Sequence, residues 1–295
     1  MKLLGIYKNG NYNVTILSDG TKIRETEAEE FIPAFAENCD VKITDRCDGG
    51  CVMCYEGCTP NGKHGDILNQ KFLDSLHPFT ELAINGNDLS HPDLIPFLEK
   101  LREKKVIANM TVNQIHFERN QELIDKLIDD KLIFGLGISL HKPTEEFVKT
   151  VKKYPNAVIH TINGILSQSD IEILKDNNLK ILILGYKKLR RGKDWFKKEY
   201  EDILAKQKWL FDNLEDIINH FEVVSFDNLA IKQLEVERLM DEKEWEEFYM
   251  GDDGNFTFYI DLVEGTFAKN SLSLERFPIE DTIDKMFCKI LSLNK

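Results

Sequence analysis

Short apolar runs alternate with amphipathic segments over most of the chain, from Val41 to about Phe226. In the segments 93–104 and 121–130, leucine and isoleucine recur every three or four residues, which predicts amphipathic helices. Strands that alternate with helices form βαβ units around a parallel sheet. The pattern therefore predicts an α/β fold, and six or seven such units favour a partial (β/α)6-type barrel over a flat doubly wound sheet. The predicted strands are VKIT, ELAI, VIANMTV, LIFGLGISL, AVIHTI, KILILGY and VVSF.

Both ends of the chain have a different pattern. Near the N-terminus, Asn9-Gly10 and Asp19-Gly20 flank a stretch in which apolar residues alternate with polar ones, and this predicts a β-hairpin. Near the C-terminus, the charged segment 187–222 and the acidic segment 232–249 are helix-like, and Gly-Asp turns between alternating aromatic residues then predict a second hairpin. We expect three parts, with a soft boundary before the last: an N-terminal hairpin and lead-in at 1–40, the barrel at 41–232, and a small α+β C-terminal cap at 233–295.

The charge of the chain narrows the choice of partners. The 295 residues include 38 basic and 51 acidic side chains, which gives a formal net charge of -13. Such a charge disfavours nonspecific binding to nucleic acid or to an anionic membrane. We find no signal peptide, transit segment or apolar run of transmembrane length in the sequence, so we expect a cytoplasmic protein.

The cysteines are the strongest chemical signal. Four of the six lie between Cys47 and Cys58, whereas Cys39 and Cys288 are isolated and are expected to be small buried apolar residues. This layout does not suit a disulfide framework. In a chain without a secretion signal it favours metal or redox chemistry in a reducing compartment.

The core of this cluster is a CxxxCxxC motif formed by Cys47, Cys51 and Cys54. Three thiolates on one short loop can hold three corners of a cubane 4Fe–4S cluster, and the glycines between them let the loop curl. With Cys58 the spacing also approaches a ferredoxin motif, and four thiolates would suit structural zinc. Two-cluster ferredoxins need a second cysteine run, and zinc sites usually pair two CxxC knuckles, so the three-thiolate cluster is favoured.

A CxxxCxxC loop after the first strand of a β/α repeat resembles the radical S-adenosylmethionine (radical SAM) superfamily. The Cys-Tyr-Glu ending resembles its peptide-modifying and SPASM-type members. The resemblance implies that SAM binds the open iron, that a one-electron donor such as flavodoxin or ferredoxin reduces the cluster, and that a 5′-deoxyadenosyl radical takes a hydrogen atom from a substrate. A peptide or protein is the expected substrate, and a small metabolite or nucleoside is the alternative. From another class, the chain could be a non-catalytic iron–sulfur or zinc-stabilised binding or electron-transfer protein.

The same resemblance implies a set of SAM contacts at the ends of the predicted strands. Asn85-Gly86-Asn87 replaces the GGE motif that contacts the SAM amino group, and the missing glutamate removes a charge-assisted hydrogen bond. Met53 stands where the family has an aromatic residue near the adenine. The remaining implied contacts are Tyr55, Asn113, Ser139, His141, Asn163 and Gly185.

Three further features of the sequence bear on the predicted function. Cys58 is a candidate hydrogen-atom donor, because the S–H bond of a thiol is weak. The basic run from Lys187 to Lys193 follows a predicted strand on the expected active-site side and could meet an anionic substrate. The C-terminal segment looks like a SPASM or twitch extension, but it lacks the cysteines for an auxiliary cluster, so we predict none.

Overall fold

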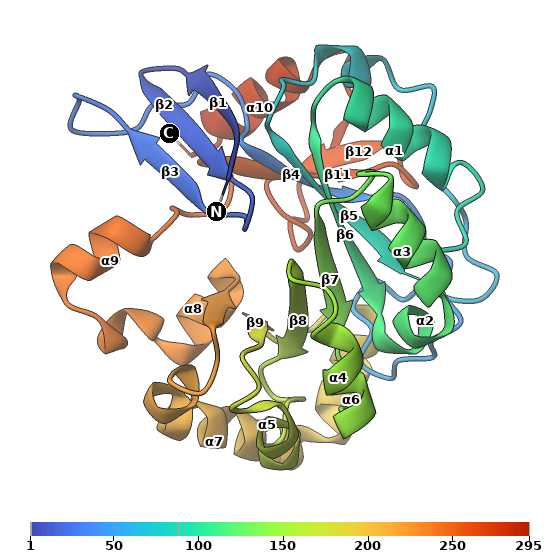
Figure 1. Ribbon diagram of the computed structural model, residues 1–295, viewed down its shortest axis with the longest axis vertical. Helices are drawn as coiled ribbons and strands as arrows, with labels where there is room; N and C mark the ends of the chain where they lie inside the picture. Colours follow the sequence, from blue (N-terminus) through green and yellow to red (C-terminus); the bar gives the residue numbers. More distant parts are fainter. Residues whose placement is uncertain (1, 88, 295) are drawn as a thin grey trace.

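The computed structural model describes residues 2–87 and 89–294, and a long, mostly parallel sheet organises them (Figure 1). Seven consecutive strands lie side by side in chain order and run parallel. Each lies in one of the predicted apolar runs or overlaps it. The strands are β4 (Asn38–Lys42), β5 (Glu81–Asn87), β6 (Ile107–Asn113), β7 (Gly135–Ser139), β8 (Ala157–Ile162), β9 (Lys180–Leu184) and β10 (Val223–Phe226).

The first of these strands differs from its predicted range of 41–44. It begins three residues earlier and ends at Lys42. It ends there because the Ile43 backbone N–H donates to the Asn85 side-chain oxygen (2.7 Å), so a side chain replaces the backbone partner that a longer strand would need.

The predicted second hairpin is present, and it extends the main sheet. β11 (Thr257–Asp261) pairs in parallel with β4, and β12 (Thr266–Ala268) and β13 (Phe277–Pro278) follow it antiparallel. Within residues 2–87 and 89–294, β10 and β13 are the two edges of this sheet, so it stays open. The fold is thus α/β with a partial, unclosed arrangement of strands. The division into a barrel and a C-terminal cap stays a prediction.

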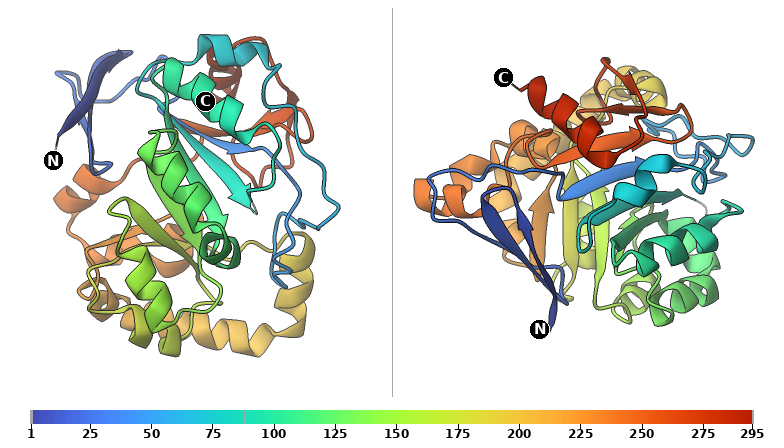
Figure 2. Two further views of the ribbon diagram at one scale, coloured as in Figure 1. Left: turned by 45° about the vertical axis from the view of Figure 1, so that its right-hand side comes forward. Right: turned by 90° about the horizontal axis from the view of Figure 1, so that it is seen from above.

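Helices cover the outer face of the curved sheet (Figures 1 and 2). The predicted helices at 93–104 and 121–130 are α1 (Leu94–Glu103) and α3 (Gln121–Asp129). The charged segment 187–222 contains two helices, α6 (Arg190–Lys198) and α7 (Tyr200–Ile218). The others are α2 (Gln114–Arg119), α4 (Glu145–Val151), α5 (Gln168–Leu174), α8 (Asn228–Leu234), α9 (Glu242–Phe248), α10 (Ile283–Ser292) and the 3-10 helices η1 (Lys71–Ser75) and η2 (Val236–Leu239).

Successive side chains of each strand alternate between the two faces of the sheet, so one face forms the core and the other carries the site. Apolar side chains such as Val41, Ile84 and Ile159 are buried beneath the helices. Residues of the opposite parity, such as Asp40 and His160, are exposed or half-buried, and strand alternation directs them to the opposite, concave face of the sheet. That side therefore carries the polar groups that are available to a ligand.

The N-terminal segment forms the predicted hairpin plus one more strand. β1 (Leu3–Asn9), β2 (Tyr12–Leu17) and β3 (Lys22–Glu25) make an antiparallel sheet. Glu37, whose side chain is 1% exposed, ties this sheet to the start of β4. Its carboxylate accepts hydrogen bonds from the Tyr12 hydroxyl (2.6 Å) and from the Arg24 guanidinium (2.8 and 3.1 Å).

The two isolated cysteines differ in burial. Cys39 is 3% exposed and lies in the core, as expected. Cys288 is exposed, so the expectation that it is buried was wrong. It lies on the outer face of α10, while Met286, Phe287 and Ile290 form the buried face of that helix. No helix in the described part of the chain has the length and apolarity needed to cross a membrane.

Candidate functional site

The cysteine loop, residues 47–58, leaves the carboxyl end of β4, the end of a parallel sheet at which α/β proteins bind their ligands. Backbone hydrogen bonds close the base of the loop: Cys47 N–H donates to the Thr59 carbonyl (3.0 Å), and Asp45 N–H donates to the Lys63 carbonyl (2.8 Å). Gly50 has a positive φ of 64°, a conformation that glycine adopts without strain. The base of the loop is therefore held by backbone hydrogen bonds, and glycine allows the tight turn inside the loop.

The four thiols of this region differ in burial and environment. Cys47, Cys51 and Cys54 are half-buried, and Cys58 is 6% exposed. A hydrogen bond from the Cys58 thiol lowers the pKa of Cys54 to about 5, with further help from backbone N–H groups and the charge of Arg191. The same contact raises the pKa of Cys58, which makes Cys54 the thiolate of this pair. Thiolates are the form in which cysteine binds metals.

The three motif cysteines offer donors that suit an iron–sulfur cluster: thiols on one short loop, half-exposed and flexible at two glycines. Asn113, at the end of β6, donates its side-chain N–H to the Cys51 sulfur (3.4 Å). Across residues 2–87 and 89–294, the structure contains no group of three or more His, Cys, Asp or Glu side chains placed to hold a metal ion.

One end of the cysteine loop is held by α2. The Asp48 carboxylate bonds to the Nε2 atom of His116, whose side chain is 5% exposed, and Arg119 lies 3.8 Å from the other Asp48 oxygen. This contact lowers the pKa of Asp48, chiefly through the His116 hydrogen bond. The His116 ring also lies close to Gly49, where a Cβ atom would be 3.5 Å from it.

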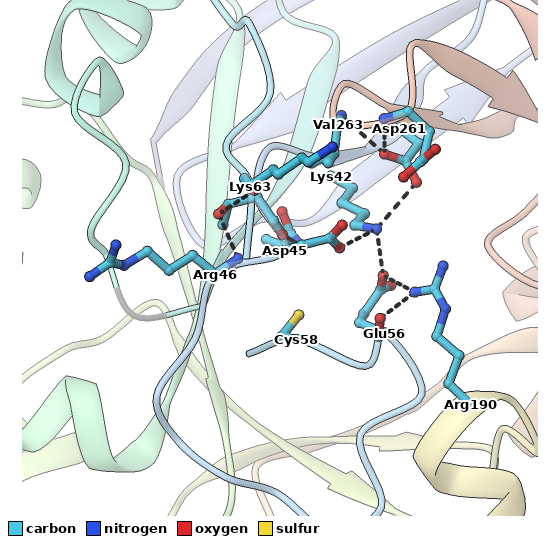
Figure 3. Close-up of polar contacts among 12 residues, drawn as sticks. Lys42, Asp45, Arg46, Glu56, Cys58, Lys63, Arg190, Asp261 and Val263 are labelled. Atoms are coloured by element: carbon cyan, nitrogen blue, oxygen red, sulfur yellow. Dashed lines mark hydrogen bonds and ion pairs between the residues drawn. The ribbon is translucent and has the colours of Figure 1, made fainter. Parts of the chain in front are cut away.

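The other end of the loop is held by a buried lysine (Figure 3). Lys42, the last residue of β4, has a side chain only 1% exposed. Its ammonium lies 2.6 Å from the Asp45 carboxylate and 3.3 Å from those of Glu56 and Asp261. Burial alone would lower the pKa of Lys42, but the three carboxylates outweigh it and raise the pKa, so the lysine is charged. Arg190 donates to the Glu56 carbonyl from the opposite side.

The Asn85-Gly86-Asn87 trio lies at the end of β5, next to the base of the cysteine loop. The Asn85 side chain bonds to the backbone of Ile43 and Thr44. The Asn87 side chain donates to the Thr44 and Arg46 carbonyls (3.2 and 3.3 Å) and to the Cys58 sulfur (3.4 Å). Both asparagine side chains thus bind protein groups.

Met53, Tyr55 and Gly185, which the sequence assigned to the cofactor separately, come together in the structure. They line one cavity of about 30 Å³, together with Ile162, Leu184, Tyr186 and Lys187 from the ends of β8 and β9. The Lys187 ammonium lies 4.3 Å above the centre of the Tyr55 ring. The basic run therefore packs on the cysteine loop, through Lys187 here and through Arg190 at Glu56.

The other predicted cofactor residues are more dispersed. Ser139 is half-buried at the end of β7 and pairs in register with both Asn113 and His160. His141 is exposed beyond that strand, and its backbone N–H donates to Gln114. Asn163 is 1% exposed, and its side chain donates to Gln233 of α8 (3.1 Å). Ser139, His141 and Asn163 are not among the residues that line the cavity at Met53, although Gln233 also accepts the backbone N–H of the lining residue Tyr186 (2.9 Å).

Sequence reasoning missed the residues that hold the loop. Lys42, Asp45, Asp48 and His116 carry no motif, and Glu56 entered only as the end of the Cys-Tyr-Glu match. A lysine at the end of an apolar strand was the one available hint, since a lysine is rarely buried unless it is paired. Its partner Asp261 is 219 residues away in the chain.

No protein-family model matches the chain, and no curated protein sequence matches it. Among solved structures, the chain is similar to the crystal structure of Streptococcus suis SuiB, with a TM-score of 0.55 and 14% sequence identity. The similarity covers 88% of this chain and 69% of the SuiB chain. At this identity the comparison establishes a shared fold.

Proposed function

We propose that the chain is a radical SAM enzyme that binds one 4Fe–4S cluster through Cys47, Cys51 and Cys54. The observation that carries the proposal is the position of these thiols, on one loop at the carboxyl end of the first strand in a parallel sheet. The fold shared with SuiB, a radical SAM-type protein, supports it. A one-electron donor such as flavodoxin or ferredoxin is the proposed partner.

The bound cluster and SAM would supply the chemistry, which is reductive cleavage of SAM to a 5′-deoxyadenosyl radical that takes a hydrogen atom from the substrate. The protein would supply orientation and a site that excludes water. Asn113 donates to the Cys51 sulfur, and the contacts of Asp48 and Glu56 hold the two ends of the loop.

We place SAM between the cysteine loop and the ends of β5 to β9. The adenine would lie at the apolar cavity of Met53 and Gly185, where the flexible side chains of Met53 and Lys187 must move to widen it. The SAM ammonium would lie near Asn85-Gly86-Asn87. Ser139, His141 and Asn163 are proposed contacts at the neighbouring strand ends.

A peptide or protein is our proposed substrate, on the strength of the Cys-Tyr-Glu resemblance, and a small metabolite or nucleoside is the alternative. The concave face offers polar groups to either one, among them the exposed Asp40 and the half-buried Thr111 and His160. In this proposal Cys58 is a candidate hydrogen-atom donor.

Electron paramagnetic resonance of the anaerobically reconstituted, dithionite-reduced protein tests the proposal. We expect the signal of a reduced 4Fe–4S cluster, and we expect that signal to shift when SAM is added. A cluster signal that is indifferent to SAM, or no cluster at all, would contradict the enzyme assignment.

A second candidate, a non-catalytic iron–sulfur or zinc-stabilised protein, is supported by the contact between Cys58 and Cys54. Four thiolates would close the site and leave no iron for SAM. Cys58→Ala separates the two candidates. The radical SAM proposal predicts that this variant keeps about four iron atoms per chain and the response to SAM. Loss of the cluster in Cys58→Ala, similar to its loss in a Cys51→Ala control, would favour the second candidate.

A further inference from the structure

The Lys42 ammonium joins three segments that are distant in the sequence (Figure 3). Asp45 belongs to the turn after β4, Glu56 to the cysteine loop, and Asp261 to the end of β11. Asp261 and Lys42 are register partners in the parallel pair of β11 and β4. The buried Lys42 therefore connects the C-terminal strand with the cysteine loop.

The charges of this cluster balance. The three carboxylates of Asp45, Glu56 and Asp261 all face Lys42. Two arginines supply the other positive charges: Arg190 lies 3.8 Å from Glu56, and Arg276 lies 3.9 Å from Asp261. Removing one partner from a buried ion cluster leaves an uncompensated charge, which is strongly unfavourable. Glu56, whose side chain is 14% exposed, is therefore restrained to the position that faces Lys42.

Backbone hydrogen bonds from Cys54 N–H to the Cys51 carbonyl (3.3 Å) and from Gly57 N–H to the Cys54 carbonyl (3.2 Å) form turns in the loop, but they do not fix the Glu56 side chain. Gly50 and Gly57 both have positive φ values, 64° and 70°, and glycine populates many conformations at little cost. Glu56 is two residues from Cys54 and two from Cys58. An ion pair at Glu56 consequently limits where the Cys54 sulfur can lie.

We infer that Lys42 is a positioning residue for the cluster ligands, acting through Glu56, and that Asp261 of the C-terminal strand sets the position of Lys42. The inference rests on the proposed function, because it assigns the cysteine loop to a cluster. It makes β11 a supporting element of the cofactor site, although β11 contributes no ligand.

Asp261→Asn is the most informative variant. One Asp261 oxygen accepts the backbone N–H groups of Val263 (3.1 Å) and Glu264 (3.0 Å), and the other faces Lys42. Asparagine can keep the first role with its carbonyl oxygen while its NH₂ group replaces the oxygen that faces Lys42. The local turn is then preserved, and the contact with Lys42 is lost, together with the two longer contacts of the same oxygen, to the Tyr259 hydroxyl (3.5 Å) and Arg276 (3.9 Å). Asp281→Asn is the matched control, because Asp281 pairs with Lys71 on the surface of the same C-terminal segment.

The experiment reconstitutes wild type, Asp261→Asn, Lys42→Met, the double variant and Asp281→Asn with iron and sulfide, and measures the rate at which a chelator removes the iron. Loss of a residue that orients metal ligands typically costs about 10-fold or more in metal affinity. We expect iron loss about 10-fold faster in Asp261→Asn and Lys42→Met, and unchanged in Asp281→Asn. The double variant should be no worse than Lys42→Met alone, because both changes remove one connection.

A second measurement does not need the cluster. The alkylation rate of Cys54 in the folded apoprotein, followed by peptide mass spectrometry, should rise in Asp261→Asn and stay constant in Asp281→Asn. Circular dichroism confirms that each variant is folded. Equal iron loss and equal alkylation in Asp261→Asn and Asp281→Asn would overturn the inference. Absence of a cluster in the wild type would instead overturn the proposed function, while the alkylation rates would still test the connection.

Discussion

Single residues set the charge states on the concave face of the sheet. His160 of β8 points to this face, and desolvation lowers its pKa to about 4. Gly137 of β7 makes room for the ring, since a Cβ atom there would lie 2.5 Å from the His160 Cε1 atom. The histidine is thus neutral at physiological pH, in a space that a larger neighbour would fill.

This lowered pKa predicts a dependence of stability on pH. Between pH 6.5 and about 4, the unfolded state binds a proton at His160 that the folded state does not bind, so the free energy of unfolding should fall as the pH falls. The full span corresponds to about 3 kcal/mol. Urea titrations at several pH values should show that the free energy of unfolding falls less between pH 6.5 and about 4 in His160→Gln than in the wild type.

His220 is a control of opposite sign. A hydrogen bond with Asp176 raises the pKa of this half-buried histidine, so it stabilises the fold below pH 6.5, and the contribution disappears as the pH rises through its folded-state pKa. His220→Gln should lower stability mainly in acid. If the free energy of unfolding of His160→Gln fell as steeply in acid as that of the wild type, the lowered pKa of His160 would be contradicted.

At the scale of elements, the boundary between β6 and α2 combines a structural role with a proposed chemical one. Asn113 is the N-cap of α2, and its side-chain oxygen accepts the Ile115 N–H (3.0 Å). Its side-chain nitrogen donates to the Cys51 sulfur. One residue therefore starts the helix and contacts a proposed cluster ligand.

Two substitutions at Asn113 separate these roles. Asn113→Asp keeps an acceptor for the cap, whereas Asn113→Ala removes it and should lower the free energy of unfolding of the apoprotein by about 1 kcal/mol. Both variants lose the donor to Cys51. Urea unfolding checks the first role, and a cap with no role in stability would give equal midpoints for the two variants.

At the scale of the whole molecule, buried charge connects segments that the backbone leaves separate. Glu37 joins the N-terminal sheet to β4 through Arg24, Tyr12 and Lys22, the last at 3.3 Å. Lys42 does the same for β11 and the cysteine loop at the other end of β4. β4 is thus the strand to which both terminal segments are attached.

Glu37→Gln tests the first of these connections. The substitution leaves the partly buried Arg24 without its carboxylate, whereas Lys22 keeps its ion pair with Glu81 (2.6 Å). We expect a loss of about 3 kcal/mol in the free energy of unfolding. Glu29→Gln, at an exposed position, should change it by no more than about 0.5 kcal/mol. Coinciding denaturant midpoints for Glu37→Gln and Glu29→Gln would show that the contacts of Glu37 contribute little to the stability of the fold.

The sequence by itself determined the strands β5 to β10, the helices α1 and α3, and the loop that carries Cys47, Cys51 and Cys54. These features depend on local periodicity and on spacing within a few residues, which a single sequence displays directly. It also assigned Met53 and Gly185 to one cofactor, but only through a resemblance, because 132 positions (185 − 53) separate them.

Only the tertiary structure decided which distant residues meet. The pairing of β11 with β4 places Asp261 beside Lys42, and the position of α2 places His116 beside Asp48. Each contact depends on strand order and register, which are set by packing over the whole sheet. A buried lysine also stays charged only where carboxylates surround it, and here one of the three lies 219 residues away, beyond the reach of any local pattern.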